Sequence, residues 1–181
     1  MEKTIRLVLV AFAVGFTLAF IQFGLIYTLN IRFASTVSVY LILFGAWLFG
    51  MMLGLITPDI RYSRWVAAAS LSYLIFCVSL LIDVPNNIVN FLAIVSAMFS
   101  GAWGMRFVRV FSAYYPSARM VLLWENNGFI VGIILTLCVI IFYGLFVSFV
   151  STFLIVSVPW LPIIWCGRPQ EALGKISFKK T

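Results

Sequence analysis

Long apolar runs, separated by short polar links, fill most of this sequence and constrain its fold more than any other feature. An α-helix needs about 20 apolar residues to cross the ~30 Å hydrocarbon core of a bilayer, and the first five runs are each roughly that long. A hydrophobic content of 64% with only 9% charged residues is also too apolar for an ordinary soluble domain. The sequence therefore predicts an all-α, polytopic membrane protein.

Turn residues divide the runs into six predicted transmembrane helices. The second helix ends at Thr57-Pro58-Asp59, because a proline disfavours helical geometry in the residue before it. Residues 30–36 are expected to form a polar link after the first helix. The expected helices cover residues 5–29, 37–56, 65–82, 89–111, 119–142 and 152–165.

The last apolar run is too long for a single span, so we expect a tight turn between the fifth and sixth helices. Gly144, Ser148 and Ser151 are the best candidates for this turn, because glycine and serine favour turns. Pro159 and Pro162 are expected to kink or end the sixth helix.

Lysine and arginine concentrate in cytoplasmic segments of membrane proteins, so their positions indicate orientation. With six spans and a cytoplasmic N-terminus, eleven of the twelve basic residues fall inside and Arg32 alone falls outside. We therefore expect both termini in the cytoplasm, a six-helix domain over residues 1–167 and a short basic tail over residues 168–181. The expected location is the cytoplasmic (inner) membrane of a bacterium. The basic residues expected inside are Lys3, Arg6, Arg61, Arg64, Arg106, Arg109, Arg119, Arg168, Lys175, Lys179 and Lys180.

Composition argues against several classes of function. The net charge of +7 comes from basic residues spread singly at the ends of apolar runs, unlike the basic stripe of a nucleic-acid-binding protein. The chain has no histidine, and its three cysteines form no C-x-x-C pair. No glycine-rich phosphate loop, carboxylate pair or metal-ligand cluster is visible. We expect a protein that is not an enzyme, holds no cofactor or metal and binds no nucleic acid.

A cluster of polar residues is expected at membrane depth. Glu125 and the two residues after it lie about one and a half to two turns inside the fifth helix if that helix starts near Ser117. Polar groups at this depth are costly and usually have a partner. The cluster comprises Glu125, Asn126 and Asn127 of the fifth helix, Arg106 and Arg109 of the fourth, and Gln22 of the first.

We interpret this cluster first as an ion pair between Glu125 and the two arginines, with neighbouring amides, that pins the fourth helix to the fifth. A paired carboxylate of this kind would stay ionised. The main alternative is that the cluster handles a substrate or a proton. Contact with a lipid head group or a partner protein is the remaining possibility.

Small residues recur at four-residue spacing in three predicted helices. This spacing puts them on one helix face, where they let a neighbouring backbone approach closely. Tight packing within the chain is one explanation, and docking of a second protein or a second copy is the other. These ridges are Ala46, Gly50 and Gly54 in the second helix, Ala97 and Gly101 in the fourth, and Gly128 and Gly132 in the fifth.

The order of these elements resembles one six-helix half of a major facilitator transporter, and more closely the membrane domain of membrane-bound spermidine synthase-like proteins. The residues that carry the resemblance are Ile26-Tyr27, Arg32, Ser38-Val39-Tyr40, Leu53-Gly54, Arg119, Trp124 to Gly128, and Gly132. The resemblance implies a half-facilitator-like bundle that needs a partner, since a facilitator's transport path lies between two halves. The soluble methyltransferase-like domain of that family is missing here, so its enzymatic activity is not implied.

These observations favour a non-enzymatic integral membrane subunit that packs against other membrane proteins as an accessory, anchoring or assembly component of a larger complex. Its expected partners are membrane lipids and either other integral membrane subunits or a second copy of itself. One alternative is a half-size transporter that works as a dimer, with a polar path at the fifth helix and Gln22. A second alternative is a membrane partner for a separately encoded soluble enzyme, held through the basic tail.

Overall fold

The computed structural model describes residues 2–33, 36–57, 61–82, 84–115, 117–144 and 146–166, and nearly all of these are helical. These residues confirm the all-α prediction, and five of the helices are long and apolar enough to cross a membrane, as a multi-pass protein requires. The elements are α1 (Glu2–Phe33), α2 (Thr36–Ile56), α3 (Tyr62–Leu81), α4 (Asn86–Phe111), η1 (Ser112–Tyr114), α5 (Ala118–Tyr143), α6 (Phe146–Ser157), η2 (Val158–Trp160) and α7 (Leu161–Cys166).

The first helix is longer than predicted, because α1 continues to Phe33 through most of the expected polar link. Arg32, in its last turn, donates from Nε to Oδ1 of Asn86 at 2.8 Å and from a terminal nitrogen to the carbonyl oxygen of Val84 at 3.2 Å. These bonds join the end of α1 to the start of α4. The tertiary contact therefore explains why the polar end of the helix stays ordered.

The predicted tight turn after the fifth helix is confirmed at Gly144. This residue ends α5 with φ of 57°, a left-handed conformation that glycine adopts without strain, and its N–H bonds to the carbonyl oxygen of Ile140. Ser148 and Ser151, the other turn candidates, lie within α6 instead. One residue with positive φ is enough to reverse the chain, so the serines are free to be helical.

The predicted interruption by proline is also confirmed. Pro159 lies in the short 3-10 segment η2, between α6 and α7, and Pro162 lies in the first turn of α7. Together these three short elements replace the single sixth helix that the sequence predicts.

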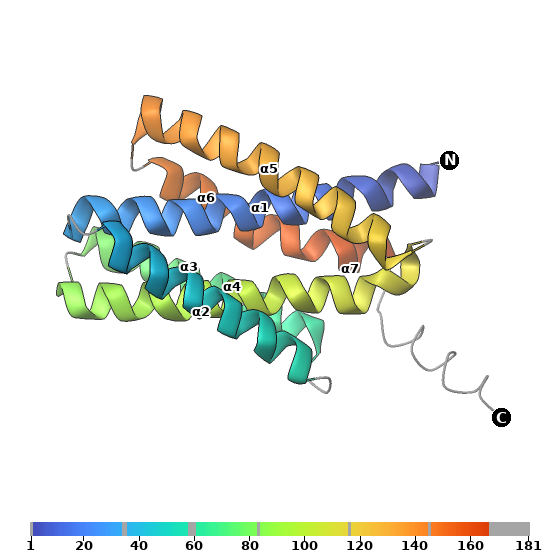
Figure 1. Cartoon of the computed structure of the whole chain (residues 1–181), viewed down its shortest axis with the longest axis horizontal. Coiled ribbons are helices and arrows are strands. Elements are labelled where there is room, and N and C mark those ends of the chain that lie inside the picture. Colours follow the sequence, from blue (N-terminus) through green and yellow to red (C-terminus); the bar gives the residue numbers. More distant parts are fainter. Residues whose placement is uncertain are drawn as a thin grey trace.

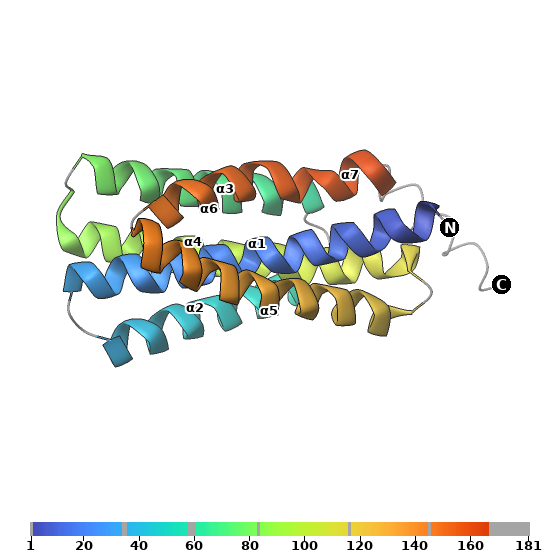
Figure 2. The same cartoon turned by 90° about the horizontal axis from the view of Figure 1, so that it is seen from above.

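The helices pack mainly in pairs, with α5 on α1, α2 on α4, and α3 packed on α4 and α6 (Figure 1). In Figure 2, α3 and α6 lie on one side of the bundle, α1 and α4 lie in the middle, and α2 and α5 lie on the other side. The core is therefore built around α1 and α4. Both views also show that α1 begins at the same end of the bundle at which α7 ends.

Glycines make the α2–α4 contact close. A Cβ added at Gly50 would overlap the backbone carbonyl of Met98, and one at Gly54 would overlap that of Ala102. In the opposite direction, Gly101 of α4 lies against the carbonyl of Trp47. Ala46 and Ala97, the alanines of these two ridges, also pack in the core. The small-residue faces of α2 and α4 are therefore used within the chain.

The α1–α5 contact is equally close. Gly128 lies against the carbonyl of Phe12, Gly132 against the carbonyl of Phe16, and Gly15 of α1 against the carbonyl of Glu125. The α5 ridge is therefore also covered by this chain, and the small residues that face it on α1, Ala11, Gly15 and Ala19, recur at the same four-residue spacing. This row was not among the predicted ridges, although the same four-residue spacing identified the other three.

Side-chain hydrogen bonds fasten α3 to the broken sixth segment. Pro159 has no N–H to donate to the carbonyl oxygen of Ile155, four residues earlier. The hydroxyl of Ser70 donates to that oxygen instead, at 2.9 Å. Nearby, Tyr62 donates to the carbonyl oxygen of Pro159 at 3.1 Å. The break in the sixth segment is thus stabilised by polar groups of α3.

We expect Ser70→Ala to lower the free energy of unfolding by about 1–3 kcal/mol, because it leaves a buried carbonyl oxygen unsatisfied. Thermal unfolding of the purified protein in a mild detergent measures the effect. Ser157→Ala is the matched control, since that exposed hydroxyl bonds only to the carbonyl oxygen of Phe153 in its own helix. Equal unfolding midpoints for the two variants would contradict the role given to Ser70.

Candidate functional site: a cavity between two helix pairs

The start of α5 sets the depth of the predicted polar cluster. Ser117 is the N-cap, as the sequence suggested, and its hydroxyl accepts a hydrogen bond from the N–H of Met120 at 3.3 Å. Glu125 follows seven residues after Ala118, so it lies about 10 Å along the helix axis. Its carboxylate is thus within the candidate membrane span, as predicted.

Three consecutive polar residues of α5 do not share one environment. Glu125 is half-buried, Asn126 is exposed, and Asn127 is exposed on a surface that no other described helix covers. The next residue, Gly128, is buried against α1. Because successive residues of an α-helix are about 100° apart, the three polar residues cannot all belong to one internal cluster.

Glu125 and Asn126 line a cavity of about 200 Å³ between the α1–α5 pair and the α2–α4 pair. We call it the Glu125 cavity. Its other lining residues are Leu18 of α1, Trp47 and Met51 of α2, Gly104, Met105 and Val108 of α4, and Leu122 and Phe129 of α5. The two helix pairs leave this space because α5 crosses α1 rather than packing along α4.

The structure does not bring Arg106 or Arg109 together with Glu125, so the expected ion pair between the fourth and fifth helices is corrected. Arg109 donates from its guanidinium to the carbonyl oxygen of Leu55, in the last turn of α2. Arg106 is buried on α4 and does not line the Glu125 cavity. The physical reason is the close α1–α5 crossing at Gly15 and Gly128, which holds α5 away from most of α4.

Arg109 instead helps to end α2. The last four carbonyl groups of a helix have no partner within it, and a cation is favourable at that end of the helix dipole. Arg109, on the neighbouring helix α4, supplies both a hydrogen-bond donor and a positive charge at the end of α2. This residue is therefore structural in the described arrangement.

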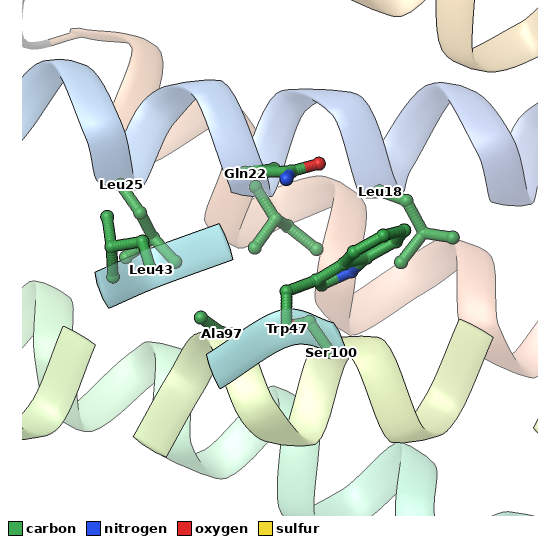
Figure 3. Close-up of a pocket in the computed structure, with 8 residues that line it drawn as sticks. Leu18, Gln22, Leu25, Leu43, Trp47, Ala97 and Ser100 are labelled. Carbon is green, nitrogen blue, oxygen red and sulfur yellow. The ribbon is translucent and has the colours of Figure 1, made fainter. Parts of the chain in front are cut away.

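Gln22 lies in a second, smaller cavity of about 10 Å³, which has room for about one water molecule. Figure 3 shows the indole of Trp47 reaching from α2 toward α1, beside Leu18 and Gln22, with Ser100 of α4 nearby. Within the described residues, Oε1 of Gln22 and Nε1 of Trp47 are buried without a hydrogen-bond partner. A buried water could satisfy both.

Trp47 and Leu18 line both cavities, so these two side chains separate Gln22 from Glu125. Trp47 was not among the residues predicted for the polar cluster. A signal was present, however, because an indole N–H in the middle of an apolar helix poses the same problem of unsatisfied hydrogen bonding as a buried amide.

The described residues contain no group of three or more His, Cys, Asp or Glu side chains able to hold a metal ion. Cys77 and Cys138, the two cysteines whose side chains are described, do not lie near each other or near a base. The sulfur of Cys77 lies 3.1 Å from the hydroxyl of Thr152, and Cys138 is exposed on α5. The chemistry available in the Glu125 cavity is therefore that of one carboxylate, one amide and aromatic rings.

The described part of the chain is a helical bundle in which five helices are long and apolar enough to span a membrane. No protein-family model, curated protein or solved structure matches the chain.

Proposed function

We propose that this chain is a non-enzymatic integral membrane subunit that packs against another membrane protein as an accessory, anchoring or assembly component. The observation that supports this role best is Asn127, an amide exposed on the outer face of α5 within the apolar span. It lies nine residues after Ala118, or about 13 Å along the axis. In hydrocarbon, an amide without a partner costs several kcal/mol.

The surroundings of Asn127 leave room for such a partner. Only 17% of the most apolar stretch of α5 is buried, and the nearby exposed residues are apolar, among them Leu123, Ile130 and Ile134. Lipid can cover aliphatic side chains, but it cannot satisfy an amide. We therefore assign the face around Asn127 to a helix of another integral membrane protein that offers a hydrogen-bonding group. The glycine ridges are covered within the chain and do not serve this contact.

The topology proposed with this role has six crossings and both termini in the cytoplasm of a bacterial cell. The elements α6, η2 and α7 together run along much of the bundle, from the α5–α6 turn back toward the end where α1 begins (Figures 1 and 2). Each of these pieces is shorter than the five candidate spans, but an apolar stretch, Val150–Ile164, runs through all three of them. The basic tail of residues 168–181 lies outside the described residues, and so does its proposed contact with a soluble enzyme.

A half-size transporter that works as a dimer is the second candidate, and the Glu125 cavity is the observation that favours it. Gln22 lies beyond Leu18 and Trp47 from that cavity, so a continuous polar path would need these two side chains to move. The half-facilitator resemblance supports the same candidate. Its requirement is a second copy of the chain, whereas the accessory role requires a different protein.

The deciding experiment is the mass of the particle extracted from native membranes in mild detergent, with every co-purifying chain identified. The accessory role predicts a particle that contains defined other membrane proteins. A particle made of this chain alone, monomeric or dimeric, would reject it, and a dimer would favour the transporter.

Asn127→Leu should weaken the association with the partner roughly 5- to 30-fold, the value of one interhelical amide hydrogen bond. Asn127→Gln, which keeps an amide on the same face, should retain most of the complex. The measurement is the amount of partner recovered with the tagged chain at equal expression. Full recovery with the leucine variant would show that the partner does not use this face.

A further inference from the structure

The Glu125 cavity is lined by one carboxyl group and, among the described residues, by no basic side chain. Glu125 is the one ionisable residue among those that line it. Arg109 is engaged with the carbonyl oxygen of Leu55, and Arg106 lies outside the lining. A carboxylate at membrane depth usually has a charged or hydrogen-bonding partner. Because a cation beside a carboxyl group stabilises its ionised form, this lining favours a cationic ligand.

The rest of the lining indicates which kind of cation fits. Glu125 and Asn126 together offer at most three side-chain oxygens, whereas Ca²⁺ takes six to eight oxygen ligands and Mg²⁺ needs near-octahedral coordination. The other walls include the indole of Trp47 and the ring of Phe129, with Met51 close by in the lining. Aromatic faces attract organic cations, most strongly where water is excluded. An organic ammonium group matches this lining better than a metal ion.

The size and position of the cavity limit the size of the ligand and the route by which it enters. A volume of about 200 Å³ is far larger than a water site and smaller than the roughly 300–1,000 Å³ of pockets for drug-sized ligands. Asn126 is exposed and Glu125 is only half-buried, so the carboxylate can be reached from outside the bundle. At about 10 Å from the start of α5, the site is within reach of an amine from water or of an amine on a lipid head group.

We propose that the Glu125 cavity binds a small organic ammonium group. The carboxylate of Glu125 is its counter-ion, the Oδ1 of Asn126 accepts a hydrogen bond from an ammonium N–H, and the Trp47 and Phe129 rings form its apolar walls. This site is separate from the docking face of α5, because Asn127 does not line the cavity. It can therefore be tested whatever the outcome for the partner.

The test uses the full-length chain purified in an uncharged detergent at pH 7, where an alkylamine is protonated. Butylammonium chloride is titrated by calorimetry and by its effect on the thermal unfolding midpoint. We expect saturable binding and a midpoint that rises with ligand concentration. Sodium chloride at equal ionic strength and 1-butanol, the neutral analogue, should give neither effect.

Glu125→Gln should weaken butylammonium binding at least about tenfold, because it removes the charge and keeps the shape. Trp47→Phe, which keeps a smaller ring, should weaken binding about two- to fivefold. Glu2→Gln, which removes a carboxylate at the start of α1, should leave binding unchanged. Equal binding by wild type and Glu125→Gln, equal binding of 1-butanol, or no binding by wild type would each overturn the proposal. If Glu125→Gln does not fold, a Trp47→Phe variant that binds as well as wild type overturns it.

Lipid discs identify the natural source of the ammonium group. In discs of phosphatidylglycerol alone, wild type should bind butylammonium as it does in detergent. If phosphatidylethanolamine in the discs abolishes that binding, the head-group amine occupies the site. If binding survives, the site takes an amine from water. Absence of binding in both kinds of disc would contradict the proposal.

Discussion

Gly50→Ala is expected to destabilise the chain by about 1–3 kcal/mol or more, and Gly50→Leu is expected to abolish the folded particle. A Cβ at this position has no space, because the backbone carbonyl of Met98 lies where it would be built. A flexible side chain could move away, but a helix backbone cannot yield without separating α2 from α4. The unfolding midpoint in detergent measures the first variant, and size-exclusion chromatography measures the second.

Gly45→Ala is the matched control, since it adds the same methyl group to the same helix at a position with no neighbouring atom within 4 Å. Alanine favours a helix over glycine by up to about 1 kcal/mol, so this variant should be neutral or slightly stabilised. The opposite sign of the two substitutions is the critical result. Equal effects would show that α2 and α4 do not cross at Gly50.

Loss of folding in a glycine variant would also affect a co-purification experiment. A leucine at Gly50 or Gly132 would remove co-purifying partners simply because the chain no longer folds. Substitution at Asn127 avoids this ambiguity, since its side chain is exposed. The two experiments therefore separate folding from docking.

Trp103→Ala is expected to lower the free energy of unfolding by roughly 3–5 kcal/mol, the cost of a large cavity in a packed core. The indole is fully buried on α4, and its Nε1 donates to the hydroxyl of Tyr62 at 2.9 Å. That hydroxyl in turn donates to Pro159, so Trp103 is linked through α3 to η2. Loss of the indole ring removes its packing contacts and its hydrogen bond to Tyr62. Thermal unfolding in detergent is the measurement.

Two further variants test the cause of this loss. Trp103→Phe should cost less, because it keeps an aromatic ring and loses mainly the bond to Tyr62. Trp160→Ala, at a tryptophan with 38% of its surface exposed, should have a small effect. A loss at Trp160 as large as that at Trp103 would mean that the core is not centred on α4.

The positions of the helices follow from the sequence, because helix formation and insertion depend on local composition. Apolar runs, prolines and Gly144 predicted most boundaries to within a few residues, and they predicted the broken last segment. The end of α1 was predicted too early, because the last turn of α1 is held by hydrogen bonds from Arg32 to Val84 and Asn86, which lie some 50 residues away. A local pattern carries no information about such a partner.

The choice of neighbours was decided only by the tertiary structure. Ridges of small residues occur on α1, α2, α4 and α5, and their spacing shows which face of each helix is close-packed but not which helix it meets. The pairing of α5 with α1 leaves the carboxylate of Glu125 in a cavity with Trp47 and directs Arg109 to the end of α2. By itself, the sequence determined that a carboxyl group lies inside an apolar helix long enough to span a membrane. Its surroundings depend on how the helices cross, because contacts between distant helices set the charge and volume around it.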